Sequence, residues 1–221
     1  MKLTIVYDNE VFRSGVDLKS DWGFACFIET TKKENILFDT GAKGKILLEN
    51  MQNLKINPEK IDKIVISHEH WDHNGGLEPL LDLLDKKVEV YRLEEPKKTD
   101  VTTNIVTESQ KISSGIYTTG RLQGSPVDEQ SLVLKGKKGW YVLTGCSHPG
   151  VEKILRKANQ IGDIVGLIGG FHGFNNFSVL KHLELIYPCH CTKYKQEIRK
   201  KFAKSSQNCG VGKIIELDVI D

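Results

Sequence analysis

The chain has 221 residues, 39% of them apolar, which is enough to bury one sizeable core, so we expect a single domain over residues 1–221. Its 31 Lys and Arg residues nearly balance 29 Asp and Glu residues, and the net charge of +2 gives no reason to expect a nucleic-acid partner. The N-terminal apolar run is too short for a signal peptide, and no stretch reaches the ~18 apolar residues of a membrane span, so we expect a soluble, cytoplasmic protein with no membrane partner.

Strands and helices are predicted to alternate in the N-terminal part of the chain. Segments rich in β-branched and aromatic residues predict strands at residues 4–7, 23–29, 35–38, 63–67 and 88–91. Apolar residues three and four apart predict a helix at residues 44–54, and a second helix is expected to begin at Gly75-Gly76 and to run through Leu84.

The C-terminal part begins with a polar segment, residues 93–114, which we predict to be mostly loop with short strands. Later strands are predicted at residues 131–134, 139–144, 163–168, 185–187 and 213–217, the first two forming a hairpin, with a helix at 151–160. The basic segment 193–204 has one apolar helical face, and we expect a solvated helix there rather than an anion-steering or RNA-binding face. This order favours sheets covered by helices, a layered α/β domain.

Potential metal ligands are concentrated in the stretch H-E-H-W-D-H-N-G-G at residues 68–76, directly after the strand K-I-V-I-S. Three of the seven histidines of the chain lie in it, His68, His70 and His73. Imidazole suits zinc, iron and other borderline ions, and Asp72 adds a negative charge. Four ligand-type side chains in six positions predict a metal site rather than isolated surface histidines.

Three further histidines also follow predicted strands. His148 follows G-W-Y-V-L-T-G-C-S, His172 follows I-V-G-L-I-G-G-F, and His190 follows L-I-Y-P-C. In open α/β sheets, sites form outside the carboxyl ends of strands, so we expect these side chains to join the first group. His182 lies in a predicted helix, F-S-V-L-K-H-L-E-L, and is excluded from the site.

The motifs that surround these histidines carry a family resemblance. They are I-L-F-D-T-G (36–41), H-E-H-W-D-H-N-G-G (68–76), D-E-Q-S-L-V-L (128–134), T-G-C-S-H-P-G (144–150), G-G-F-H (169–172) and P-C-H-C-T (188–192). Together they resemble the metallo-β-lactamase superfamily and, within it, the branch of 7,8-dihydropterin-6-methyl-4-(β-ribofuranosyl)aminobenzene-5′-phosphate synthase-like hydrolases. The resemblance implies one domain with the αββα four-layer sandwich fold and a dinuclear metal site at one edge of its two sheets.

The resemblance also implies the roles of individual residues. The first metal would be bound by His68, His70 and His148, and the second by Asp72, His73 and His190. Asp39, in the D-T-G motif, would brace the metal-binding loop through hydrogen bonds. We expect two divalent ions, with zinc favoured over manganese or iron.

The chain departs from the superfamily where a carboxylate usually bridges the two metals, since it has Gly-Gly-Phe-His172 at that point. The nearby acid is Asp163, which lies before the predicted strand, whereas His172 lies after it. We therefore expect Asp163 at the end of that strand that is far from the site. We therefore predict that His172 takes the place of the carboxylate, faces the metals and is catalytic together with Asp72. With Asp72 as the one ligand carboxylate, the site would keep a charge of about +3, which favours anionic substrates and weakens the second metal.

Five cysteines, an odd number, are typical of thiols in an intracellular chain rather than of a disulfide framework. Three of them flank predicted ligands: Cys146, Cys189 and Cys191. They could be ligands, a redox pair or small buried side chains, and we expect buried thiols beside the site.

Two metals about 3.5–4 Å apart can share a water and lower its pKa towards neutrality. We therefore expect a metal-dependent hydrolase that uses a metal-bound hydroxide on an anionic small molecule bearing a phosphoester or pyrophosphate. Three alternatives remain: a nuclease of the same superfamily acting on RNA or DNA, a di-iron redox enzyme, and a non-enzymatic metal-dependent sensor. The sequence specifies no oligomeric state.

Overall fold

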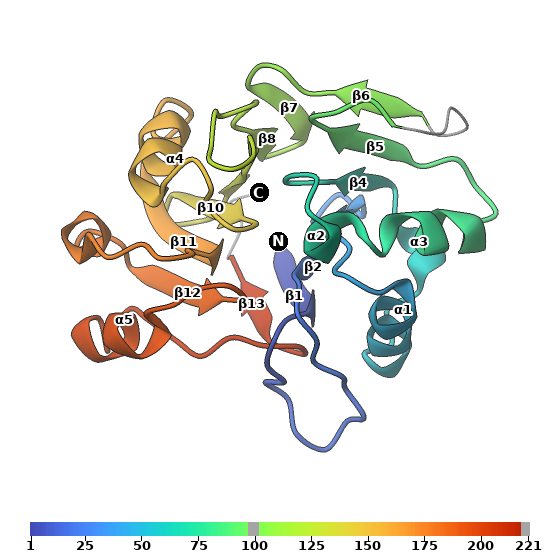
Figure 1. The fold of residues 1–221 in the computed structure, drawn as a ribbon, viewed down its shortest axis with the longest axis horizontal. Helices are drawn as coiled ribbons and strands as arrows, with labels where there is room; N and C mark the ends of the chain where they lie inside the picture. Colours follow the sequence, from blue (N-terminus) through green and yellow to red (C-terminus); the bar gives the residue numbers. More distant parts are fainter. Residues whose placement is uncertain (97–101, 218–221) are drawn as a thin grey trace.

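A computed structural model describes residues 1–96 and 102–217 (Figure 1). Within these ranges the strands of the first sheet are β1 (Lys2–Tyr7), β2 (Ala25–Glu29), β3 (Asn35–Phe38), β4 (Lys63–Val65), β5 (Glu89–Arg92), β6 (Thr103–Ile105) and β13 (Ile214–Glu216). The strands of the second sheet are β7 (Gln110–Ser113), β8 (Ile116–Thr118), β9 (Leu132–Lys135), β10 (Trp140–Thr144), β11 (Ile164–Gly170) and β12 (Leu185–Cys189).

Both sheets are mixed. The first has the order β13-β1-β2-β3-β4-β5-β6, antiparallel as far as β3 and parallel from there on. The second has the order β12-β11-β10-β9-β8-β7, in which β10, β11 and β12 are parallel and the remaining pairs antiparallel. Parallel neighbours end at the same edge of a sheet, so the residues that follow β10, β11 and β12 are brought together.

The helices cover the outer faces of the two sheets, and Figure 1 shows α1 and α3 on one outer side and α4 and α5 on the other. The α-helices are α1 (Gly44–Asn53), α2 (Trp71–Asn74), α3 (Leu77–Leu83), α4 (Val151–Ala158) and α5 (Lys195–Lys201), and the 3₁₀ helices are η1 (Pro58–Lys60) and η2 (Phe177–Leu180). Among the described residues, no helix is long and apolar enough to cross a membrane.

Strand side chains alternate between two cores because their period is two residues. In β9, Leu132 and Leu134 point into the core between the sheets, while Val133 points into the outer core under α4. A third apolar cluster lies between the first sheet and the helices α1 and α3. The predicted αββα sandwich is therefore confirmed.

Most predicted elements are present, with shifted ends. The predicted hairpin is the antiparallel pair β9 and β10. The sequence did not predict β8, nor the four-residue helix α2, which is too short to show a helical period. The predicted helix around His182 is wrong: η2 ends at Leu180, and His182 lies exposed in the turn that follows. Leu180 and Leu183, three residues apart, both pack into the outer core, and a single 3₁₀ turn with three residues per turn is enough to bury them.

Candidate metal centre

The first loop of the site follows β4 and is held by hydrogen bonds to Asp39. One carboxylate oxygen of Asp39 accepts the main-chain N–H of Ser67 at 2.7 Å, and the other accepts the Ser67 hydroxyl at 2.8 Å and lies 2.7 Å from His73 Nδ1. Asp39 is fully buried. This placement agrees with the bracing role implied for it, and it leaves His73 Nε2 as the nitrogen that faces the site.

The second loop follows β10 and is held by Glu129, for which the sequence alone indicated no role. One oxygen of this buried carboxylate accepts the main-chain N–H groups of Gly145, Cys146 and Ser147 at 3.0–3.1 Å. The other oxygen accepts the N–H of His148 at 2.8 Å. Burial raises the pKa of Glu129, but the nearby His68 and these N–H donors outweigh it and leave the pKa below its usual value.

The third loop follows β12 and is held by the N-terminal strand. Asp8, fully buried, accepts the main-chain N–H of His190 at 3.0 Å, and the Asn9 side-chain oxygen lies 2.8 Å from His190 Nδ1. Each of three loops that carry predicted ligands thus rests on a buried carboxylate: Asp39, Glu129 or Asp8. Asp8 directly follows a predicted strand, and Glu129 lies in the motif D-E-Q-S-L-V-L that leads into another, so an acid at a strand end is the signal that could have found them.

The predicted ligands of the first metal converge. His68 Nε2 and His70 Nδ1 are 3.1 Å apart, and the ring of His148 has its centre 4.7 Å from that of His68 and 4.8 Å from that of His70. One nitrogen from each ring lies within 4.8 Å of the others. His148 Nε2 is buried without a hydrogen-bond partner, which is costly for a polar atom unless something else binds it. These nitrogens fit a divalent metal.

The predicted ligands of the second metal also converge. Asp72 Oδ2 lies 3.3 Å from His190 Nε2 and 3.9 Å from His73 Nε2. His190 Nε2 is a second buried nitrogen without a hydrogen-bond partner. The indole Nε1 of Trp22 donates to Asp72 Oδ2 at 2.8 Å, and its ring packs edge-on against that of His190. No sequence pattern marked Trp22 as a site residue, because it lies in the loop before β2 and far from the ligand motifs.

Burial favours the neutral form of three of these rings, His68, His73 and His148, and the neutral form is the one that can bind a cation. Burial lowers the pKa of His68 to about 2 and that of His73 to about 3. Burial also lowers the pKa of His148. For Asp72, burial alone would raise the pKa, but the neighbouring rings of His190 and His73 outweigh it and lower the pKa. Ionised carboxylate and neutral imidazole are the forms that bind metal.

His172 lies at the open side of the cluster. Its side chain is exposed, its ring centre is 4.7 Å from that of His148, and a ring nitrogen lies within 4.8 Å of Cys146 Sγ. Of the described non-glycine residues with positive φ, four belong to the site: Asp39, Ser147, His172 and His190. Such strain is retained where the surrounding structure demands a particular side-chain direction. Asp163 precedes β11, and His172 follows it, so the two lie at opposite ends of that strand.

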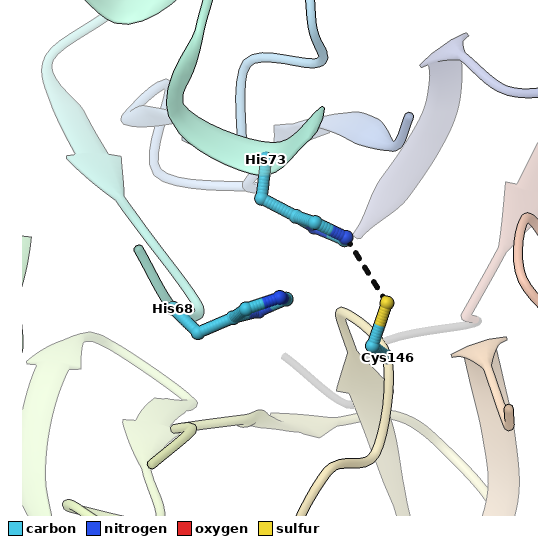
Figure 2. A group of neighbouring side chains, drawn as sticks. All are labelled: His68, His73 and Cys146. Atoms are coloured by element: carbon cyan, nitrogen blue, oxygen red, sulfur yellow. Dashed lines mark hydrogen bonds between the residues drawn. The ribbon is translucent and has the colours of Figure 1, made fainter. Parts of the chain in front are cut away.

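The other side chains in and beside these loops have simple positions. Glu69 turns away to form an ion pair with Arg92, and Trp71 is exposed. Cys189 is buried, Cys191 is half-buried, and Cys146 is buried with its sulfur 3.2 Å from His73 Nε2 (Figure 2). The structure thus brings all six predicted ligands and His172 together and leaves His182 outside; that they bind metal stays a prediction.

Known proteins resemble this chain over most of its length. A curated relative, the 7,8-dihydropterin-6-methyl-4-(β-D-ribofuranosyl)-aminobenzene-5′-phosphate synthase of Methanocaldococcus jannaschii, is 27% identical over 89% of this chain and 90% of its own. The crystal structure of Tm1679, described as a metal-dependent hydrolase of the β-lactamase superfamily, superposes with a TM-score of 0.76 at 25% identity and covers 99% of both chains.

A more distant structure shares the fold alone. Zinc-bound PqqB from Methylobacterium extorquens has a TM-score of 0.66 at 12% identity, over 98% of this chain and 100% of its own. The family model of the metallo-β-lactamase superfamily matches residues 23–155, which include the ligand motif after β4 and the loop after β10. With that match, the two sheets and the histidine cluster at their edge, this chain belongs to the metallo-β-lactamase superfamily.

Proposed function

We propose that this protein is a dinuclear metal-dependent hydrolase of small anionic molecules that carry a phosphoester or pyrophosphate. The observation that carries the proposal is the convergence of two ligand sets at one sheet edge, each with a buried ring nitrogen that lacks a partner, His148 Nε2 in one and His190 Nε2 in the other. We expect zinc in both positions, with manganese or iron as the alternatives.

Hydrogen bonds to three of the rings support the proposal that their Nε2 atoms bind metal. Asp39 lies against His73 Nδ1, the Ser67 hydroxyl against His68 Nδ1, and Asn9 against His190 Nδ1. In each case Nε2 is left for the metal, as expected when the other ring nitrogen has a hydrogen-bond partner. Two divalent ions, when bound, would activate a water and polarise the oxygen atom under attack.

The chain's own residues would divide the remaining work. Asp72 is proposed to bind the second metal, with its Oδ2 oriented by Trp22 and His190. His172 is proposed to contact the substrate, because it is exposed next to His148 while the other rings lie deeper. Partial desolvation by the neighbouring side chains lowers the pKa of His172, so its neutral ring can accept or donate a hydrogen bond at the phosphate.

The phosphate-bearing substrate is supported by two observations. A site in which five histidines and one carboxylate hold two divalent ions would retain positive charge, which attracts anions. The Methanocaldococcus jannaschii relative is named as the synthase of a 5′-phosphate compound. All five cysteines are free thiols, which supports a reducing compartment, and we propose the cytoplasm.

Elemental analysis followed by a substrate panel tests the proposal. The protein, expressed with zinc or manganese, should contain about two metals per chain and should hydrolyse phosphoesters in preference to lactones and thioesters. A stoichiometry of one at saturating metal would overturn the dinuclear site. Colour and iron would indicate redox chemistry, cleavage of nucleic acid with steep salt dependence would indicate a nuclease, and two metals without turnover on the panel would indicate a sensor.

A further inference from the structure

The sulfur of Cys146 lies at the centre of the histidine cluster. It is within 4.8 Å of ring nitrogens of both His68 and His73, of His148 and His172, and of His190 together with the sulfur of Cys191. Figure 2 shows the sulfur and the rings of His68 and His73 pointing toward one another. A group that reaches both ligand sets is placed where one atom could contact either metal.

The contacts of this thiol differ from those of the other buried thiols. Cys189 Sγ donates to the main-chain oxygen of Tyr187 at 3.2 Å, and Cys26 Sγ lies 3.9 Å from that of Phe27. Cys146 Sγ instead lies 3.2 Å from His73 Nε2, a nitrogen that is left without its proton when Nδ1 donates to Asp39. The partner of the Cys146 thiol is therefore the lone pair of His73 Nε2, which also faces the position of the second metal.

The separation suits two ligands of one ion. A tetrahedral zinc with bonds of about 2.0–2.1 Å to nitrogen and about 2.3 Å to sulfur holds the two atoms about 3.6 Å apart. The observed distance of 3.2 Å between His73 Nε2 and Cys146 Sγ is close to this value. In the metal-free protein the thiol proton would lie between these two atoms, and a metal would replace it.

The main chain holds the sulfur in this place. Glu129 accepts the N–H of Cys146 at 3.0 Å, and Gly145 O accepts the N–H of Gly170 at 3.0 Å. A Cβ on Gly170 would lie 2.6 Å from Cys191 Sγ and 3.3 Å from the Cys146 Cα, so the strand end at Gly170 closes tightly over this loop. The side chain of Cys146 is 3% exposed, so its sulfur would be shielded from water when it binds a metal.

We propose that Cys146 binds the second metal as a thiolate, together with Asp72, His73 and His190, and so supplies the negative charge that a bridging carboxylate would bring. The proposal rests on the metal centre of the proposed function. On binding, the S–H bond breaks, the sulfur keeps the electron pair and donates it to the metal, and the proton goes to solvent. His172 stays on the open side for the substrate. A soft sulfur ligand should make the second position prefer zinc, cobalt or iron to manganese.

Cobalt titration of the metal-free full-length chain, under reducing and anaerobic conditions, tests this directly. The wild type should develop a near-ultraviolet thiolate-to-cobalt charge-transfer band as the second equivalent binds, besides the visible bands of cobalt. In Cys146→Ser the charge-transfer band should disappear, and the second cobalt should bind about 10- to 100-fold more weakly. Cys191→Ser, the matched control in the neighbouring loop, should keep the band.

A carboxylate variant tests the exchange of ligand type. Cys146→Asp should keep the second metal without the sulfur band and shift its preference toward manganese. Because a variant could fail to fold, X-ray absorption of the zinc-loaded wild type gives an independent test, with one sulfur at about 2.3 Å expected. Two cobalt ions bound without a sulfur band, or a band that persists in Cys146→Ser, would overturn the proposal.

The two proposals fail separately. A sulfur band without turnover on the substrate panel would remove the hydrolase and leave the thiolate ligand. Hydrolysis with two metals but no metal–sulfur bond would support the hydrolase and overturn the thiolate ligand. A wild-type protein that binds no cobalt would overturn both.

Discussion

The carboxylate of Glu129 accepts the main-chain N–H of His148 at 2.8 Å, across 19 residues of sequence. Its other oxygen accepts three more N–H groups, from Gly145, Cys146 and Ser147, and the hydroxyl of Thr144. One buried side chain therefore shapes the whole loop that presents His148 and Cys146.

Glu129→Gln should expose how much the site depends on this loop. The amide keeps the shape but loses the charge, and its NH₂ group would face N–H donors, each of which costs about 1–3 kcal/mol when left unsatisfied. We expect at least about 3 kcal/mol less free energy of unfolding and metal affinity lower by about 10- to 100-fold. Urea denaturation and metal titration measure both. Glu94→Gln, which removes an exposed partner of Arg121, should change neither, and equal effects would argue against the bracing role.

Removing a predicted ligand should separate activity from folding. Asp72→Ala and His148→Ala should each lower turnover by more than about 100-fold, with the unfolding free energy of the metal-free protein changed by about 2 kcal/mol or less. His182→Ala should keep near-normal turnover, because His182 is exposed in a turn outside the cluster. Steady-state rates and denaturation curves of the three variants measure turnover and unfolding free energy separately. A His182→Ala protein as inactive as His148→Ala at unchanged stability would contradict the assignment of ligands.

Trp22→Phe should weaken the second metal. The substitution removes the 2.8 Å hydrogen bond from the indole to Asp72 Oδ2 but keeps an aromatic ring next to His190. We expect the second metal to bind about tenfold more weakly, with little effect on the first, in a competitive titration with a chelating dye. Trp71→Phe is the matched control, since Trp71 is 61% exposed. If both variants bound two metals as the wild type does, the hydrogen bond would have no role in holding Asp72.

The metal-free protein should lose stability as the pH falls below about 6.5. Burial lowers the pKa of His68 to about 2, so the unfolded chain, whose histidine has an ordinary pKa of about 6.5, binds a proton that the folded chain does not. The contribution of His68 is thus present above pH 6.5 and is lost between that value and the folded pKa, by up to about 1.4 kcal/mol per pH unit. Urea denaturation of chelated protein from about pH 7 to pH 5 measures the slope. It should be shallower in His68→Gln, and parallel curves would refute the assignment.

Chelation of the metals should abolish turnover. The metal-free chain should stay folded at room temperature but unfold at a lower temperature than the metal-loaded protein. Three apolar clusters are formed without metal, so circular dichroism at room temperature should be retained. Metal bound at about 1,000 times its Kd adds about 4 kcal/mol, and the Tm should fall accordingly on its removal. Loss of the sheet signal on chelation at room temperature would show that the metals are needed for folding.

The layered fold and the convergence of the six candidate ligands could be predicted from the sequence because their signals are local. Strand periodicity and helical spacing span a few residues, and His68, His148 and His190 each lie within a few residues of the end of a buried strand. A strand end is a position along the chain, so a search along the chain finds it. The helix predicted around His182 failed for the same local reason, because two leucines three apart fit a 3₁₀ turn as well as an α-helix.

The groups that orient the ligands were decided by the tertiary structure. Glu129 reaches His148 from 19 residues away, Trp22 reaches Asp72 from 50, Cys146 reaches His73 from 73, and Asp8 reaches His190 from 182. Glu129 and Cys146 lie in sequence motifs, but nothing in any of these segments indicates which ligand the side chain reaches, and none of the four spacings repeats. Only the pairing of strands into two facing sheets brings β1, β4, β10 and β12 to one edge, and burial there gives a carboxylate, an indole or a thiol its partner at the metal ligands.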